Sequence, residues 1–155
     1  MNTTTADINF HELCEKLRSM KLSSMADTLE KQLANPNSGL QSFDERISEI
    51  ICSEWDTRYN KKFIRFLKKA TLKYPAADID ESIYDADRFL DTGTIERLAA
   101  CDWIDEGKNL LITGSTGSGK TYISNALCIS ALRLFHTVRY VKASTLIYEL
   151  EQAQV

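Results

Sequence analysis

Apolar residues recur at helical spacing through the first half of this 155-residue chain. Residues 8–20 and 23–34 each carry an apolar stripe that repeats every three to four positions, which predicts two amphipathic helices. The S-x-x-E sequence at 42–45 fits a capping box and predicts the start of a third helix, which runs to about residue 73. The apolar stripe of this helix changes face along its length. Either the helix breaks near 52–57, or its two halves pack on different neighbours.

The pattern changes in the last third of the chain. The run NLLIT at 109–113 is short, apolar and followed by a glycine, which predicts a buried strand, and TVRYVKA at 137–143 predicts a second strand. Each run precedes a stretch with helical spacing, at 119–134 and at 144–153. The order strand, loop, helix, strand, helix is typical of an α/β domain with a parallel sheet.

These patterns together predict an α+β protein in three parts. Residues 1–75 are expected to form a helical N-terminal domain. Residues 76–107 are expected to form an acidic linker with short helical pieces at about 80–90 and 94–101. Residues 108–155 are expected to form the first part of a P-loop α/β domain with parallel strands.

Charge is distributed unevenly over these parts, although the formal net charge is only −3. Residues 1–73 carry 12 basic and 10 acidic side chains, residues 74–107 carry 2 and 10, and residues 108–155 carry 5 and 2. Each zone is therefore suited to a different partner.

The sequence GSTGSGKT at 114–121 matches the whole P-loop pattern G-x-x-x-x-G-K-[ST]. Its glycines let the backbone turn N–H groups inward, and the helix N-terminus that follows favours anions. A predicted strand before the motif and a predicted helix after it distinguish it from a chance glycine-rich turn. Lys120 is expected to contact the β- and γ-phosphates of ATP, and the Thr121 hydroxyl to be a ligand of Mg²⁺. The predicted ATP site consists of Gly114, Ser115, Thr116, Gly117, Ser118, Gly119, Lys120 and Thr121. ATP is favoured over GTP because no NKxD-like guanine signature follows.

The segment RYNKKFIRFLKK at 58–69 contains six basic residues and no acidic one. On a helix these residues fall within an arc of about 120°, and such a positive ridge is suited to the phosphates of duplex DNA. The predicted DNA contacts are Arg58, Lys61, Lys62, Arg65, Lys68 and Lys69. Two other interpretations stay open. The ridge is an ordinary solvated face, or it docks onto an acidic protein surface such as the 76–107 segment of the same chain or of a neighbouring subunit.

The cysteines and the N-terminal sequence indicate the cellular compartment of the protein. The four cysteines are scattered without a C-x-x-C pair, which favours buried thiols over zinc ligands or disulfides. The N-terminal sequence lacks the basic region and apolar run of a secretory signal, and no apolar stretch reaches the roughly 18 residues of a membrane span. These features predict a cytoplasmic protein that does not interact with membranes.

Four stretches together resemble the IstB-type helper ATPases of bacterial insertion sequences. They are LRSMKLSSMADTLEKQLANP, EWDTRYNKKFIRFLKKATLKYP, RFLDTGTIERLAACDWIDEGKNLLITGSTGSGKT and VRYVKASTLIYELEQAQ. That family is related to DnaC-type helicase loaders and belongs to the AAA+ ATPases. The resemblance implies an AAA+ domain after the helical one, ATP-dependent self-assembly on duplex DNA, and recruitment of a transposase. It also implies that Trp103 and Ile104 wall the adenine, although a core or linker aromatic remains an alternative for Trp103.

This chain departs from the family in one respect, which bears on catalysis. Family members continue further and carry a Walker B acid, sensor residues and an arginine finger. After Thr121 the only carboxylates here are Glu149 and Glu151, so ATP binding without efficient hydrolysis is expected and no catalytic residue is assigned. The strand at 109–113 is expected to be marginally stable or to borrow pairing from another chain. The alternative functions are a DnaC-like helicase loader and a non-catalytic DNA- or protein-binding adaptor with a vestigial P-loop.

Overall fold

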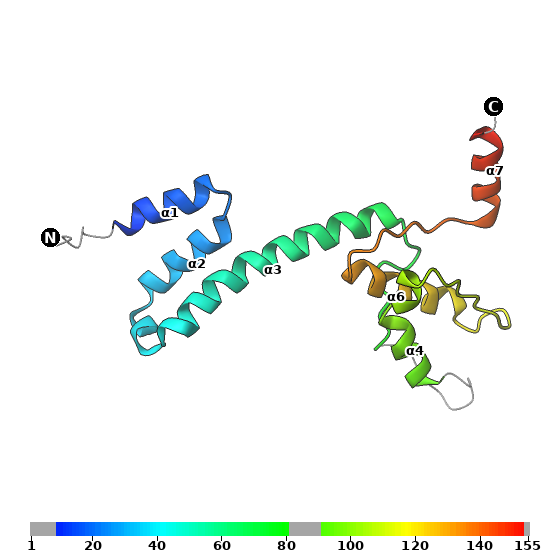
Figure 1. Cartoon of the computed structure of the whole chain (residues 1–155), viewed down its shortest axis with the longest axis horizontal. Helices are drawn as coiled ribbons and strands as arrows, with labels where there is room; N and C mark the ends of the chain where they lie inside the picture. The colour runs from blue at the N-terminus through cyan, green and yellow to red at the C-terminus, as the bar shows by residue number, and fades with distance from the viewer. Residues whose placement is uncertain (1–8, 81–90, 154–155) are drawn as a thin grey trace. The chain divides into compact units, whose positions relative to one another are not determined.

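The computed structural model of this chain describes residues 9–80 and 91–153. Within these ranges the helices, in chain order, are α1 (Phe10–Ser19), α2 (Ser23–Ala34), the 3-10 helix η1 (Pro36–Leu40), α3 (Phe43–Ala70), α4 (Thr92–Ala99), α5 (Asp102–Asp105), α6 (Lys120–Arg133) and α7 (Ala143–Ala153) (Figure 1). The helical piece expected at about 80–90 lies almost entirely outside the described residues. The chain divides into two compact units, residues 1–61 and residues 62–155, and the division falls within α3. The three-part division expected above remains a prediction.

In the N-terminal unit, the helices predicted at 8–20 and 23–34 are present as α1 and α2, which pack against each other, although several apolar side chains of both helices stay exposed. The thiol of Cys14 and the backbone of Ala26, both buried, lie at this contact, with Cys14 Sγ 3.9 Å from Ala26 O. On the outer side, the Arg18 guanidinium donates to carboxylates of Asp27 at 3.1 Å and Glu30 at 2.9 Å. Buried side chains and the ion pairs of Arg18 therefore both connect α1 to α2.

The start of α3 confirms the predicted capping box. Ser42 N donates to Glu45 Oε2 at 2.7 Å, and Glu45 N donates to Ser42 Oγ at 3.2 Å. From this cap α3 continues unbroken to Ala70. The change of apolar face therefore reflects different neighbours and not a break.

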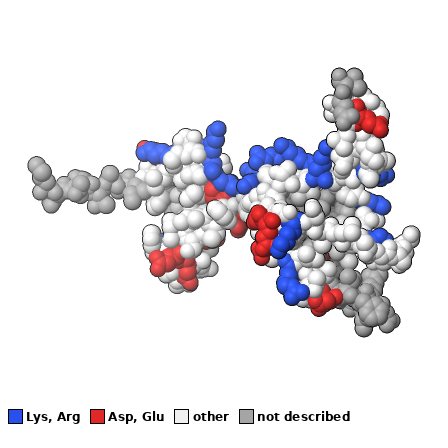
Figure 2. Space-filling view, turned by 45° about the vertical axis from the view of Figure 1, so that its right-hand side comes forward, with Lys and Arg blue, Asp and Glu red and all other residues white. Residues whose placement is uncertain are grey.

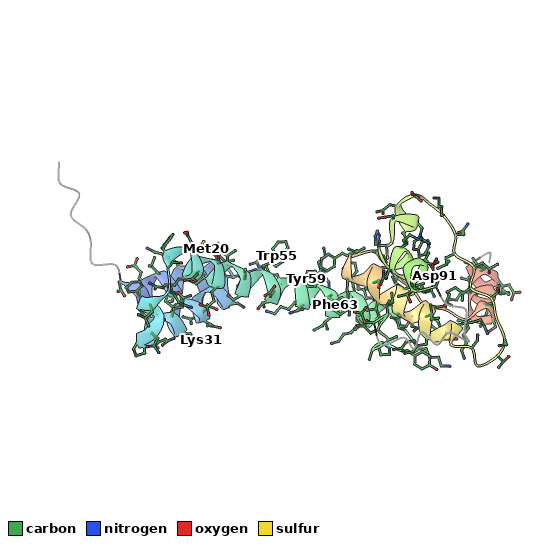
Figure 3. All side chains as sticks on the ribbon, turned by 90° about the horizontal axis from the view of Figure 1, so that it is seen from below. Met20, Lys31, Trp55, Tyr59, Phe63 and Asp91 are labelled. Atoms are coloured by element: carbon green, nitrogen blue, oxygen red, sulfur yellow. The ribbon has the colours of Figure 1, made fainter. Side chains whose placement is uncertain are left out.

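The first half of α3 packs on α2 largely through polar groups. The buried Glu54 carboxylate accepts a hydrogen bond from Ser24 N at 3.0 Å, and Ser24 Oγ lies 2.9 Å from Thr57 Oγ1. The N-cap residue of α2, Leu22, makes no side-chain hydrogen bond to the helix. Glu54 supplies an anion at this helix N-terminus instead. Trp55, on the neighbouring position of α3, points away from the helix and is 70% exposed (Figure 3).

In the C-terminal unit, α6 lies at the centre of an apolar core. Ala126, Leu127 and Ile129 of α6 are buried together with Ala77, Ile79 and Ile95, and the partly buried side chains of Phe63 and Leu67 from the second half of α3 pack against them. Helix α4 contacts α6 in the same core (Figure 1). The second half of α3 thus takes its apolar partners from this unit.

The predicted parallel strands are wrong for the residues that the structure describes, because no strand or sheet forms in 9–80 or 91–153. A strand requires a neighbour whose N–H and C=O groups complete the ladder. Instead, the backbone N–H of Tyr140 donates to Ala70 O at the end of α3, at 2.9 Å. Leu111, in the other predicted strand, is 86% exposed. The described fold is therefore helical and not α+β, although the helices expected after each run, α6 and α7, are present.

Candidate functional site

The segment 114–121 leads directly into the N-terminus of α6. Gly117 and Gly119 adopt left-handed backbone conformations, with φ of +82° and +86°, which side chains other than glycine rarely adopt. No atom lies within 4 Å of a Cβ placed on either residue, so the space above the loop is open. Gly119 is the N-cap residue of α6 and, as a glycine, makes no side-chain capping hydrogen bond. The free N–H groups of the first turn therefore border open space beside the loop.

Lys120, the first residue of α6, reaches back over this loop. Its Nζ donates to Gly114 O at 3.0 Å and to Ser115 O at 2.6 Å. Ser118 N also donates to Ser115 O, at 3.3 Å, which closes the turn. The ammonium group is thus held at the loop by backbone carbonyls, which are neutral acceptors that an anionic ligand outcompetes.

A cavity of about 220 Å³ opens beside the loop. It is lined by Gly117, Gly119, Lys120 and Thr121 of the predicted site, together with Tyr74 and Tyr122. Gly114 and Ser115 take part as acceptors for Lys120, whereas Thr116 is exposed and does not line the cavity. The structure therefore brings the motif's glycines, lysine and threonine around one hollow.

Tyr74 is a residue that the sequence reasoning missed. It lies in the segment that follows α3, and its backbone N–H donates to Asn125 Oδ1 at 3.1 Å. Asn125 Nδ2 in turn donates to Thr121 O at 2.7 Å, so one fully buried amide joins this segment to the loop's threonine. The signal was an amide side chain among the inward-facing residues of the predicted helix, since buried polar groups are normally hydrogen-bonded.

A second anchor holds the same segment on α6. Asp78 N donates to the Tyr122 hydroxyl at 3.2 Å, and Arg133 Nη2 donates to Asp78 Oδ2 at 3.0 Å. The N–H of Asp80 and, next, the Arg133 guanidinium lower the pKa of the Asp78 carboxyl, so that it stays ionised. Tyr74 and Tyr122 also lie with ring centroids 6.2 Å apart. The aromatic wall of the cavity is therefore fixed from both ends.

The residues around the cavity fit the phosphate end of a nucleotide. A helix N-terminus whose N-cap is a glycine, two open left-handed glycines and a lysine that donates to backbone carbonyls favour an anion. For Mg²⁺ the lining supplies one oxygen side chain typical of a ligand, the Thr121 hydroxyl. Among residues 9–80 and 91–153 no group of three or more His, Cys, Asp or Glu side chains is arranged to hold a metal ion.

Trp103 and Ile104 line a different hollow, of about 350 Å³, which shares no residue with the phosphate cavity. Trp103 Nε1 donates to Leu98 O at 3.0 Å, which fixes the indole against the end of α4. Cys128 of α6 lines the same hollow, and burial raises the pKa of its thiol. The adenine role of Trp103 and Ile104 remains a prediction.

The six basic residues predicted to contact DNA all lie on α3, but three of them have partners within the protein. Arg58 Nε donates to Glu54 Oε1 at 2.7 Å, and Arg58 Nη2 to Lys21 O at 2.9 Å. Lys62 Nζ lies 3.7 Å from the centroid of the Phe135 ring, and the Arg65 guanidinium lies 5.9 Å from that of Phe66.

The other three basic residues of this set, Lys61, Lys68 and Lys69, are exposed. Figure 2 shows Lys and Arg side chains gathered along the surface of α3. Lysine side chains at the surface keep their charge in water and contact phosphates as mobile point charges. These three residues are therefore the members of the set most available to an outside ligand.

None of the helices in the described residues is both long enough and apolar enough to cross a membrane.

The loop, the helix N-terminus and the cavity identify this chain as a candidate phosphate-binding protein. Residues 15–155 match the sequence profile of the family described as IstB-like ATP binding protein, and this chain belongs to that family. It is 37% identical over 138 residues to the protein described as the ATP-binding protein of insertion sequence IS1162 from Pseudomonas fluorescens, a match that covers 89% of this chain and 60% of that protein. It is 33% identical over 144 residues to the insertion sequence ATP-binding protein y4uH of Sinorhizobium fredii, covering 93% of this chain and 58% of that protein.

A third relative, described as an ATP-binding protein in an insertion sequence of Mycobacterium tuberculosis, is 30% identical over 134 residues, which are 86% of this chain and 53% of that protein. The chain thus spans between 53% and 60% of the lengths of these three relatives. The matches confirm the resemblance that the sequence motifs indicate.

Proposed function

We propose that this chain binds ATP with its phosphates at Gly114–Thr121, as part of the transposition machinery of an insertion sequence. The observation that carries the proposal is the position of Lys120, whose ammonium lies across the loop at 3.0 Å from Gly114 O, beside an open cavity and the N-terminus of α6. On binding, the phosphates take the place of the two carbonyl acceptors of Lys120, and Thr121 contacts the accompanying Mg²⁺.

The activity that we assign to these residues is binding. The lining of the phosphate cavity within the described residues is glycine, lysine, threonine and tyrosine, with no carboxylate. Glu149, one of the two acids after Thr121, is engaged with Arg139 at 2.6 Å. A water molecule that attacks the γ-phosphate is typically positioned by a carboxylate or amide side chain, and the lining in the described residues has neither.

Duplex DNA and a transposase are the proposed partners, together with further copies of the chain. The basic residues of α3 support the DNA contact, since their charge matches the phosphate backbone. The names of the relatives, all ATP-binding proteins of insertion sequences, support a role in transposition. In this proposal ATP binding promotes assembly of copies on DNA, which then recruits the transposase.

Titration with a fluorescent ATP analogue, with and without Mg²⁺, tests the nucleotide site. Lys120→Ala is expected to weaken binding at least tenfold, because it removes the charge that faces the phosphates. Thr121→Ala is expected to reduce the effect of Mg²⁺ more than the affinity without it. Lys108→Ala is the matched control, since Lys108 pairs with Glu106 and does not line the cavity. Equal affinity of the wild type and Lys120→Ala would remove the proposed site.

Binding of a duplex at two salt concentrations tests the DNA contact. The triple variant Lys61→Ala, Arg65→Ala, Lys68→Ala is expected to weaken binding and to flatten the salt dependence, by about 0.9 in slope for each phosphate that is no longer neutralised. Lys31→Ala, an exposed lysine on α2, serves as the control. Unchanged affinity of the triple variant would exclude Lys61, Arg65 and Lys68 as DNA contacts.

A further inference from the structure

We infer that the C-terminal unit carries a second DNA contact, a groove in which Lys69, Arg139 and Lys142 hold the phosphate backbone of a duplex. This inference rests on the proposed DNA binding and extends it from α3 to a segment that the sequence analysis assigned to a strand. Arg139 and Lys142 were not among the predicted DNA contacts.

The groove measures about 660 Å³ and runs between the end of α3, the segment 137–142 and the first turns of α7. Its lining combines three cations with hydroxyl groups: Lys69, Arg139 and Lys142 with Thr71, Thr137 and Thr145. Lysine, arginine and threonine side chains are typical donors to phosphate oxygens in protein–DNA complexes. The composition of the groove therefore suits an anionic backbone.

Two hydrogen bonds hold the walls of the groove together. Tyr140 N donates to Ala70 O at 2.9 Å, and Thr71 Oγ1 donates to Tyr140 O at 3.2 Å. Because Lys69 directly precedes Ala70 and Arg139 directly precedes Tyr140, these bonds keep cations from two distant parts of the sequence on one groove. A prearranged set of charges loses less entropy on binding than charges on separate mobile segments.

The charge balance of the groove is positive. Among the described residues, Glu149 is the single acid in its lining, and Arg139 Nη2 donates to Glu149 Oε1 at 2.6 Å. In the described part of the chain, Lys69 and Lys142 form no ion pair, and both are exposed. A phosphate group that enters the groove therefore meets two unpaired ammonium groups and competes with Glu149 for the guanidinium of Arg139.

Duplex DNA is favoured over an acidic protein because the groove continues a surface that already has DNA as its proposed ligand. Lys69 belongs both to the basic residues of α3 and to the groove lining, and Lys68 precedes it on the same exposed helix end. A backbone that follows α3 reaches the groove without a gap in positive charge. Contacts of this kind are independent of base sequence and depend strongly on salt.

The test uses the full chain and a fluorescent duplex of random sequence, at two salt concentrations. The double variant Arg139→Ala, Lys142→Ala, which leaves the predicted α3 contacts intact, is expected to lower affinity about tenfold at low salt and to reduce the salt slope by about 0.9 for each phosphate that is no longer neutralised. Glu149→Gln is expected to raise affinity several-fold, because it frees Arg139 without adding bulk. Lys108→Ala, outside the groove, is the control.

The outcomes separate this inference from the proposal on which it rests. If the triple variant of α3 loses affinity while the Arg139 and Lys142 double variant binds as the wild type does, the groove is wrong and DNA binding stands. If the wild type does not bind duplex DNA, both fail. A polyglutamate that competes as well as DNA at equal charge overturns the groove as a DNA site. A partly unfolded variant binds DNA less tightly, but the salt dependence of its remaining folded fraction is unchanged. If the double variant is less stable, the slope of log affinity against log salt therefore decides whether the groove contacts phosphates.

Discussion

The buried amide of Asn125 joins Tyr74 to Thr121, accepting a hydrogen bond from Tyr74 N at 3.1 Å and donating one to Thr121 O at 2.7 Å. Asn125 is completely buried. The segment after α3 and the threonine of the phosphate loop therefore depend on the same side chain. A substitution of Asn125 is therefore expected to change both the packing of the C-terminal unit and the candidate nucleotide site.

Asn125→Ala is expected to lower the free energy of unfolding by about 1 to 3 kcal/mol, because it leaves the partly buried N–H of Tyr74 without this acceptor. It is also expected to weaken ATP binding, since Tyr74 is no longer held at the cavity. Urea unfolding and ATP titration measure the two effects. Ser130→Ala is the control on the same helix, since Ser130 Oγ bonds within α6 to Ala126 O, at 3.3 Å. An unchanged urea midpoint for Asn125→Ala would contradict the bridge.

Gly119→Ala tests the backbone of the phosphate loop. At φ of +86° an alanine is strained by about 1 to 2 kcal/mol, so we expect lower stability and weaker ATP binding. Gly39→Ala is the matched control, because Gly39 has no positive φ and no atom within 4 Å of an added Cβ. Chemical unfolding and ATP titration of both variants check this. Equal behaviour of the two alanines would show that the left-handed turn is not required.

Glu54→Gln tests the anion at the N-terminus of α2. The Arg58 guanidinium, and with it the N–H groups of Met25 and Ser24, lower the pKa of the Glu54 carboxyl from its usual 4.5. A lowered pKa means that the charged form contributes stability above about pH 4.5, and that this contribution is lost as pH falls through the lower, folded-state pKa. Wild type is therefore expected to melt higher than Glu54→Gln at neutral pH, by an amount that shrinks below pH 4.5.

Thermal melts across this pH range measure the difference, with Glu151→Gln as the exposed control. A difference between wild type and Glu54→Gln that stays constant from neutral to acid pH would show that the carboxylate charge has no role at this helix end.

Arg58→Ala separates structural from DNA-binding charges on α3. Arg58 is engaged with Glu54 at 2.7 Å and with Lys21 O at 2.9 Å, whereas Lys68 is exposed. We expect Arg58→Ala to lower the melting temperature and to change DNA affinity less than Lys68→Ala does. Melting curves and duplex titrations check this pair. Loss of DNA affinity by Arg58→Ala with an unchanged melting temperature would place Arg58 at the DNA instead.

Local signals predicted part of the structure well. The capping box at Ser42 and Glu45 forms as expected because both partners lie within one helical turn and need no distant residue. The choice between a broken helix and two packing environments was not decidable from α3 alone. The answer depends on the residues that each half packs against: Ser24 bonds to the first half, and the core that contains Leu127 contacts the second.

The predicted strands failed for a non-local reason. An apolar run such as 109–113 is compatible with a strand, but a strand forms only when a neighbour pairs with it. In the described residues Tyr140, in the second run, bonds to Ala70 of α3, a pairing partner that no periodicity indicates. Tyr74 was missed at the phosphate cavity for the same reason, since it is separated from Thr121 by a long stretch of sequence.

The family, the helices and the composition of the phosphate loop were predictable from local sequence, because helix periodicity, capping and the P-loop spacing depend on residues close together in the chain. The folded chain was needed to show which charges of α3 are engaged internally, which tyrosines border the cavity, and that Lys69 shares a groove with Arg139 and Lys142. Those outcomes depend on hydrogen bonds and packing between residues far apart in the chain, and such contacts arise only when the chain folds.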